Sequence, residues 1–197
     1  MDLSERIDRQ FQDSVQAKLQ SLDSLGPTIG VAIERMTQAL VAEKKIMACG
    51  NGGSAADSQH FAAELVNRFE QERPPLAALA LTTDTSVLTS IGNDYDYSLV
   101  FAKQVQALGR TGDLLIAIST SGNSPNVVAA VHAAHDLEID VIALTGRGGG
   151  ELGTILGERD LHLCVPSTST ARIQEVHALI LHCFCDGIDS LLLGNDA

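Results

Sequence analysis

The chain has 197 residues, of which 45% are hydrophobic, so it has room for one domain with a core of ordinary size. Its 25 acidic residues outnumber its 13 basic ones and give a formal net charge of −12, which argues against direct binding to nucleic acid or to a membrane. No apolar run approaches the ~20 residues of a membrane span, the first ten residues lack the apolar core of a signal peptide, and the four cysteines form no CxxC pair, so we expect a cytoplasmic protein with reduced thiols.

The first forty residues predict two amphipathic helices. Pro27 is expected to open the second of them, which carries Ile29, Ile33 and Met36. The apolar faces of these helices either cover a sheet or pair with another subunit, and the pattern leaves both options open. In the first helix, over residues 2–22, an apolar side chain recurs at every fourth position: Leu3, Ile7, Phe11, Val15 and Leu19.

A glycine-rich loop follows the first predicted strand, residues 45–49, and precedes a helix over residues 55–67. Gly52 and Gly53, next to Asn51, allow the backbone to approach a ligand closely. The spacing is not the GxGxxG pattern of dinucleotide sites. In the helix, His60 and Glu64 are four residues apart and therefore share one face. Their spacing is consistent with three roles: a pair of metal ligands, an acid–base couple or a plain surface contact.

The next segment predicts a short strand over residues 77–81 and a helix that ends near Ile91. A polar loop over residues 92–95 then contains Asn93 and Asp94, which either hold sugar hydroxyls or serve as turn residues. A helix over residues 98–108 leads to the central strand.

The central strand is the unbroken apolar run 114–118, which is typical of a parallel strand covered on both faces. The hydroxyl-rich sequence Ser119-Thr120-Ser121-Gly122-Asn123-Ser124 follows it, and Pro125 is placed to begin a helix with Ser124 as its N-cap. Amide groups at a helix N-terminus and neutral hydroxyls favour a phosphate. The alternative is an ordinary capped turn, but four hydroxyl side chains in six residues favour phosphate binding.

The remainder predicts two more strands, at residues 141–144 and 161–165, and a long helix over residues 171–193. His182 lies among apolar residues of that helix, so it is either hydrogen-bonded in the core or placed for chemistry. The alternation of strands and helices predicts a three-layer α/β sandwich around a five-stranded parallel sheet, with helices in residues 1–43 and the sheet core in residues 44–197.

Five stretches together resemble the sugar isomerase (SIS) family, and within it the bacterial phosphoheptose isomerases. They are CGNGGSAADSQHFAAEL, IGND, LLIAISTSGNSPNV, ALTG and ARIQEVH, and the resemblance spans nearly the whole chain. It implies a single SIS domain with a doubly wound sheet and a homotetramer with active sites between subunits. It also implies interconversion of D-sedoheptulose 7-phosphate and D-glycero-D-manno-heptose 7-phosphate through an enediol, the first step of ADP-heptose biosynthesis for lipopolysaccharide.

The resemblance also assigns roles to residues. It implies that Glu64 and His182 are the catalytic base and acid, and that a Zn²⁺ ion, one per subunit, is held by His60, Glu64, Gln174 and His182. Gln174 and His182 are eight residues apart, a ~12 Å rise along one helix, which makes Gln174 the weaker ligand candidate. The implied substrate contacts are Asn51, Gly52, Gly53, Glu64, Asn93, Asp94, Ser119, Thr120, Ser121, Ser124 and Gln174.

A different function stays open beside the enzyme. Several stretches, such as NRFEQERP and CFCDGID, resemble a non-catalytic SIS-fold adaptor that binds the replication initiator DnaA. The presence of His60, Glu64 and His182 in this chain favours the isomerase.

Overall fold

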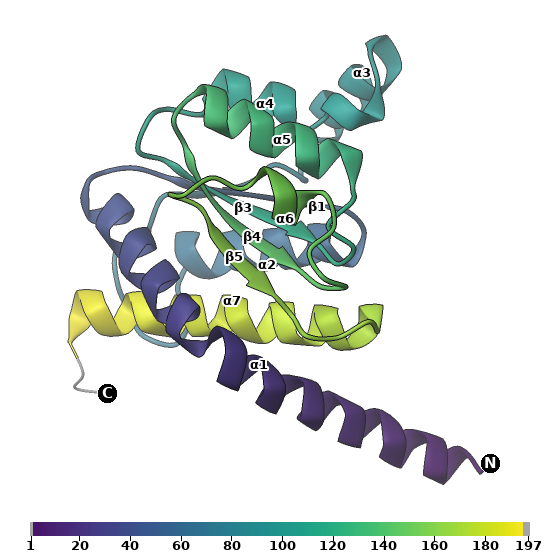
Figure 1. Ribbon diagram of the computed structural model, residues 1–197. Coiled ribbons are helices and arrows are strands. Elements are labelled where there is room, and N and C mark those ends of the chain that lie inside the picture. The colour runs from purple at the N-terminus through teal and green to yellow at the C-terminus, as the bar shows by residue number, and fades with distance from the viewer. Residues whose placement is uncertain (1, 195–197) are drawn as a thin grey trace.

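A computed structural model describes residues 2–194 and contains one five-stranded sheet with helices on both faces (Figure 1). All strand pairs are parallel and the strand order is β2-β1-β3-β4-β5, which confirms the doubly wound sheet. The strands are β1 (Ile46–Gly50), β2 (Ala78–Ala80), β3 (Leu114–Ser119), β4 (Asp140–Thr145) and β5 (Leu161–Cys164).

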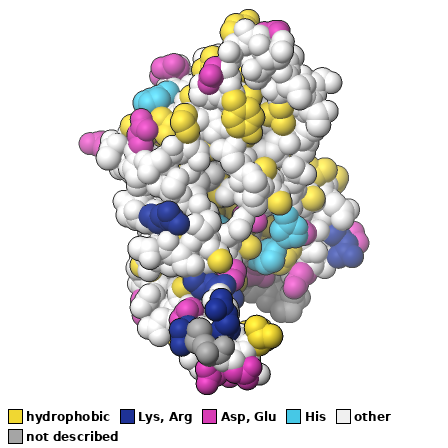
Figure 2. All heavy atoms as spheres, turned by 90° about the vertical axis from the view of Figure 1, so that its right-hand side faces the viewer, with side chains coloured by type: hydrophobic (Ala, Val, Ile, Leu, Met, Phe, Trp, Pro, Cys, Tyr) yellow, Lys and Arg dark blue, Asp and Glu magenta, His cyan; other side chains and the backbone are white. Residues whose placement is uncertain are grey.

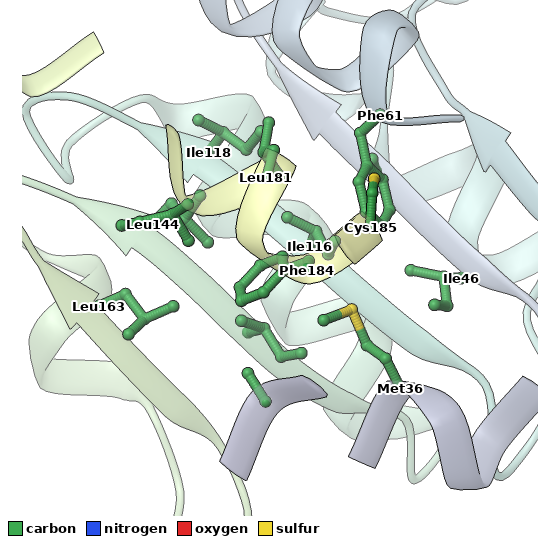
Figure 3. Packing of buried hydrophobic residues seen from close by; sticks show 14 of the residues in the cluster. Met36, Ile46, Phe61, Ile116, Ile118, Leu144, Leu163, Leu181, Phe184 and Cys185 are labelled. Carbon is green, nitrogen blue, oxygen red and sulfur yellow. The ribbon is translucent and has the colours of Figure 1, made fainter. Parts of the chain in front are cut away.

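Two hydrophobic clusters lie between the sheet and the helices, one on each face of the sheet. On one face of the sheet, α1 (Leu3–Val41), α2 (Gly53–Val66) and α7 (Thr170–Leu193) pack over side chains such as Ile116, and Figure 3 shows Phe184 of α7 in this core. On the other face lie α3 (Thr85–Asp94), α4 (Ala102–Leu108), α5 (Pro125–Asp136) and α6 (Leu152–Ile155). Alternate residues of β3 enter the two clusters, as the pleat of a strand requires.

The prediction of two N-terminal helices is wrong, because α1 is one helix of 39 residues with Pro27 inside it. An internal proline removes one backbone hydrogen bond and costs ~3 kcal/mol. Burial of Ala32 and Met36 in the core offsets that cost, since both are fully buried after the proline. The first half of α1 projects beyond the sheet, where Gln10 contacts Arg172 of α7, and its large apolar residues are exposed there (Figure 1).

Two smaller predictions also need correction. The segment expected to be one helix over residues 98–108 is a 3-10 turn, Tyr97–Leu99, followed by α4. By length and composition, α7 is apolar enough to cross a membrane, which the sequence analysis did not anticipate. Its buried residues, among them Ile180 and Phe184, belong to the core under the sheet, and this packing explains its apolar composition.

Candidate functional site

The strand order places two polar loops side by side. The chain leaves β1 toward β2 on one side and continues from β3 toward β5 on the other, so the topology switches direction between β1 and β3. In open parallel sheets, ligands bind in the crevice at the carboxyl ends of the strands at such a switch point. The loops that follow β1 and β3 are the two glycine- and hydroxyl-rich stretches that the sequence singles out.

The loop after β3 is folded on itself by its own hydroxyl groups. The Oγ atoms of Ser119 and Ser124 are 3.0 Å apart, and the amide of Asn123 donates to Ser121 Oγ at 3.2 Å. Ser124 is the N-cap residue of α5, as predicted, but its side chain makes no capping hydrogen bond. The first amides of α5 are therefore not covered by a side-chain cap, which suits a phosphate oxygen.

The backbone conformation and close packing at position 122 require a glycine in this loop. Its φ is +69°, and a Cβ built there would lie 1.8 Å from the carbonyl oxygen of Gly149. The loop over residues 146–150 therefore packs directly against the loop after β3. Glu151 strengthens the contact, because its amide donates to Asn123 Oδ1 at 2.8 Å.

A reciprocal pair of amides joins the loop after β1 to α5. Asn51 Nδ2 donates to Asn126 Oδ1 and Asn126 Nδ2 donates to Asn51 Oδ1, both at 2.8 Å. The hydroxyl of Tyr97 donates to Asn51 Oδ1 at 3.4 Å. Asn126 is almost fully buried and is not among the predicted site residues. Its position directly after Pro125, which opens α5, is the signal in the sequence that could have identified it.

Gln174 of α7 packs against the glycine loop. A Cβ built on Gly53 would lie 1.5 Å from Gln174 Nε2, so only glycine leaves room for the amide as it stands. Gln174 also lies close to the carboxylate of Asp57, one turn into α2. Burial raises the pKa of Asp57, while nearby His60 and Gln174 oppose this shift. Asp57, which is not among the predicted site residues, therefore lies close to both Gln174 and His60.

The candidate catalytic side chains meet at His60. Its Nε2 lies 2.8 Å from His182 Nε2, and its Nδ1 lies 3.5 Å from Glu64 Oε1. The contact between the two Nε2 atoms requires one ring to donate a proton and the other to accept it. Phe69 lies against the other side of this pair, with its ring centroid 5.6 Å from that of His182. Glu64 and His182 are thus brought to the same histidine rather than into direct contact with each other.

This group is open to solvent. The side chain of His60 is 48% exposed and that of Glu64 is 21% exposed, so a ligand can reach both. Figure 2, which views the molecule from the side toward which the strand arrowheads of Figure 1 point, shows histidine side chains together at the surface with acidic side chains close by. His182 is half-buried and bonds to His60, so it is not a core histidine, the alternative that the sequence left open.

Within residues 2–194, the structure forms no ready cluster of three or more His, Cys, Asp or Glu side chains around a metal position. Two of the four predicted zinc ligands, His60 and His182, do converge through their Nε2 atoms. Imidazole nitrogens with a carboxylate nearby are donors that Zn²⁺ prefers. Gln174 packs instead against Gly53 and Asp57, in line with the two helical turns that separate it from His182.

Asn93 and Asp94 stand apart from the other predicted residues. They form the last residues of α3 rather than a loop, and both are exposed. The side-chain amide of Asn93 donates to Asp94 at 2.8 Å. In the described part of the chain, neither side chain bonds to a predicted site residue outside this pair.

Comparisons with known proteins agree with this geometry. The SIS domain family matches residues 10–146. Phosphoheptose isomerases of Azoarcus sp. and Aromatoleum aromaticum are each 66% identical to this chain over 194 residues, which is 98% of this chain and of each relative. Two solved structures of phosphoheptose isomerases are also similar to this chain. The one from Neisseria gonorrhoeae is 54% identical with a TM-score of 0.92, and the one from Francisella tularensis is 48% identical with a TM-score of 0.94. Each match covers 96% of this chain and 100% of the solved chain. Nothing in these relatives supports the adaptor hypothesis.

Proposed function

We propose, since this chain belongs to the SIS domain family and within it to the phosphoheptose isomerases, that it converts D-sedoheptulose 7-phosphate to D-glycero-D-manno-heptose 7-phosphate, the first step toward ADP-heptose. The observation that carries the proposal is the meeting of Glu64 and His182 at His60, on the helices that border the polar loops of the switch point. An acid–base pair beside a phosphate cradle is what an aldose–ketose isomerase needs.

The phosphate of the sugar is assigned to the loop after β3. Ser119, Thr120, Ser121 and Ser124 offer hydroxyl groups, and α5 offers its N-terminal amides. The dipole of α5 favours an anion there without a charged side chain. This is how a chain with a net charge of −12 would bind an anionic sugar. Asn51, Gly52, Gly53 and Gln174 are assigned to the sugar itself, together with Asn93 and Asp94.

The proton transfer is assigned to Glu64 and His182. The Glu64 carboxylate takes a proton from C1 of the ketose while His182 donates one to the carbonyl oxygen at C2, which gives the enediol. Glu64 then returns a proton to C2, and His182 takes the hydroxyl proton from O1 to leave the aldehyde. Each residue ends in its starting state. His60 contacts both residues and would hold them in orientation.

We assign a zinc ion to His60 and His182, with Glu64 and Gln174 as the remaining candidate ligands. The convergence of the two Nε2 atoms supports the assignment. When bound, zinc would polarise the carbonyl oxygen of the sugar as a Lewis acid, in place of the proton from His182, because a nitrogen that binds zinc cannot also hold a proton. Metal analysis of the purified protein tests this: we expect about one equivalent of zinc per chain in the wild type and a clear loss in H60A. A wild-type protein that is fully active after chelation and contains no metal would contradict the assignment.

A homotetramer in the cytoplasm is part of the proposal. The first half of α1 exposes an apolar stripe, including Ile7, Phe11 and Val15, that a second copy would cover. The four cysteines are unpaired, as expected in a reducing compartment. Mass measurement in solution should give four chains for the wild type and fewer for F11E; a monomeric wild type would contradict the tetramer.

An isomerase assay tests the function directly. Purified wild-type protein is incubated with sedoheptulose 7-phosphate, beside E64Q and the control E72Q. Glu72 follows α2 in the chain, is 88% exposed and pairs with Arg68. We expect turnover with the wild type and E72Q and none with folded E64Q. No turnover by the wild type would refute the function, and full activity of E64Q would remove Glu64 from its role.

A further inference from the structure

A buried arginine lies where the candidate catalytic helix α2 ends. Arg73 donates from Nη2 to the carbonyl of Glu64 and from Nη1 to the carbonyl of Leu65, each at 2.8 Å. Its Nε donates to Asp189 Oδ1 of α7 at 2.6 Å. The side chains of Arg73 and Asp189 are 1% and 4% exposed. One guanidinium thus joins the two helices that carry the candidate catalytic residues.

The chemistry of a helix end explains why an arginine suits this place. The last carbonyls of a helix have no partner within the helix, and that end carries the negative end of the helix dipole. A planar guanidinium can donate to two such carbonyls and to a carboxylate at once, which a lysine cannot do. Arg73 takes the main-chain oxygen of Glu64 itself, so it fixes the backbone from which the proposed base projects.

The partner carboxylate lies on the helix face that reaches the site. Asp189 is seven residues after His182, two turns along α7, so both face α2. Cys185 lies between them on that face. Burial raises the pKa of the Cys185 thiol to about 12, with smaller contributions from the nearby charges of Glu64 and Asp189. Glu64 therefore lies close to this face of α7. The α2–α7 contact is therefore fixed at one point by Arg73 and Asp189 and at another by the two histidines.

We propose that Arg73 and Asp189 are positioning residues for the isomerisation: the pair holds the C-terminal turn of α2 on α7, so that Glu64 and His60 keep their alignment with His182. The inference rests on the proposed isomerase function. Neither side chain is available to touch the substrate, because both are buried. Their effect therefore falls on the chemical step, while the phosphate loop after β3 continues to bind the sugar.

The test compares kcat, KM and stability in three variants. D189N removes the charge with little change in shape, and R73K keeps the positive charge but loses the planar fork. R73M/D189L replaces the whole pair by apolar side chains, a change that often preserves the stability of a buried ion pair. We expect kcat per folded protein to fall by about tenfold to a hundredfold in all three, because small misplacements of catalytic groups cost that much. KM should change little, and R73K should retain the most activity.

A matched control lies directly before β3, at the end of the sheet opposite the polar loops of the site. Asp113 is likewise a buried carboxylate in an ion pair; it accepts from Lys45 Nζ and from the backbone amides of Lys45 and Arg110. D113N should lower stability as D189N does and leave kcat at the wild-type level.

The outcomes separate the two proposals. An inactive wild type refutes the proposed function. An active wild type with a normal kcat in the folded variants refutes the positioning role, as does a stable R73M/D189L with restored kcat. If D189N does not fold, R73K and R73M/D189L decide the question in the same way.

Discussion

Replacing Gly53 by alanine should separate the activity of this protein from its stability. The backbone at Gly53 is not in the left-handed region, so alanine fits its conformation, and removal of glycine flexibility from the unfolded chain is worth ~0.4–1 kcal/mol. The new Cβ would lie 1.5 Å from Gln174 Nε2 and 2.6 Å from its Cδ. Because this is the far end of a flexible side chain, Gln174 can turn away, at the expense of its contact with Asp57, worth up to ~1 kcal/mol.

These opposing effects leave the free energy of unfolding of G53A within about 1 kcal/mol of the wild type. Activity has no such compensation, because the amide has left its position. Loss of one substrate hydrogen bond, ~0.5–1.5 kcal/mol, corresponds to a fall in kcat/KM of about twofold to thirteenfold. Urea unfolding and steady-state kinetics with sedoheptulose 7-phosphate measure the two quantities.

Two comparisons make this prediction strict. In a Q174A background the Gly53→Ala change should have no further effect on kcat/KM, since its target is gone. G30A, within α1, meets nothing within 4 Å of the new Cβ and should raise stability by ~1 kcal/mol with normal activity. A wild-type kcat/KM for G53A would refute the assigned position of Gln174, and so would an equal loss in the presence and absence of the Gln174 side chain.

Three further changes follow from buried groups. N126A removes the reciprocal partner of Asn51 and should cost ~1–3 kcal/mol of unfolding free energy and raise KM; an unchanged KM would separate this amide pair from substrate binding. F184A removes a fully buried ring that contacts Phe61 edge-on and should cost ~3–5 kcal/mol in urea unfolding; a cost below 1 kcal/mol would contradict the packing. Burial lowers the pKa of His177 from 6.5 to about 4, so the unfolded chain binds a proton below pH 6.5 that the folded chain accepts only near pH 4. Stability should therefore fall by about 3 kcal/mol as the pH falls through this window, and less in H177Q; parallel pH curves for the two proteins would refute this.

Much of the fold was predictable because its signals are local. The apolar run of β3, the hydroxyl loop and Pro125 follow one another in the sequence and form a strand, a loop and a helix start in the structure. Pro27 misled the prediction, because its local cost is offset by core contacts of Ala32 and Met36 that the sequence does not reveal.

The candidate site was predictable in its residue types more than in its contacts. The spacing of His60 and Glu64 on one helix face is visible in the sequence, but the 2.8 Å contact between His60 and His182 joins residues 122 positions apart. Asp57 and Asn126 were missed for the same reason, because each acts through a partner on another element. The topology of the sheet, rather than any local pattern, brings these partners together.

The most direct measurement follows the hydrogen that moves during isomerisation. Sedoheptulose 7-phosphate is converted by the wild-type protein in D₂O, and the aldose product is analysed for deuterium at C2. A carboxylate that carries the proton between C1 and C2 can exchange it with solvent, so the product should contain deuterium at C2, and E64Q should form no such product. A product that retains only the original hydrogen at C2, or deuterium incorporation at the wild-type rate by E64Q, would contradict proton transfer by Glu64.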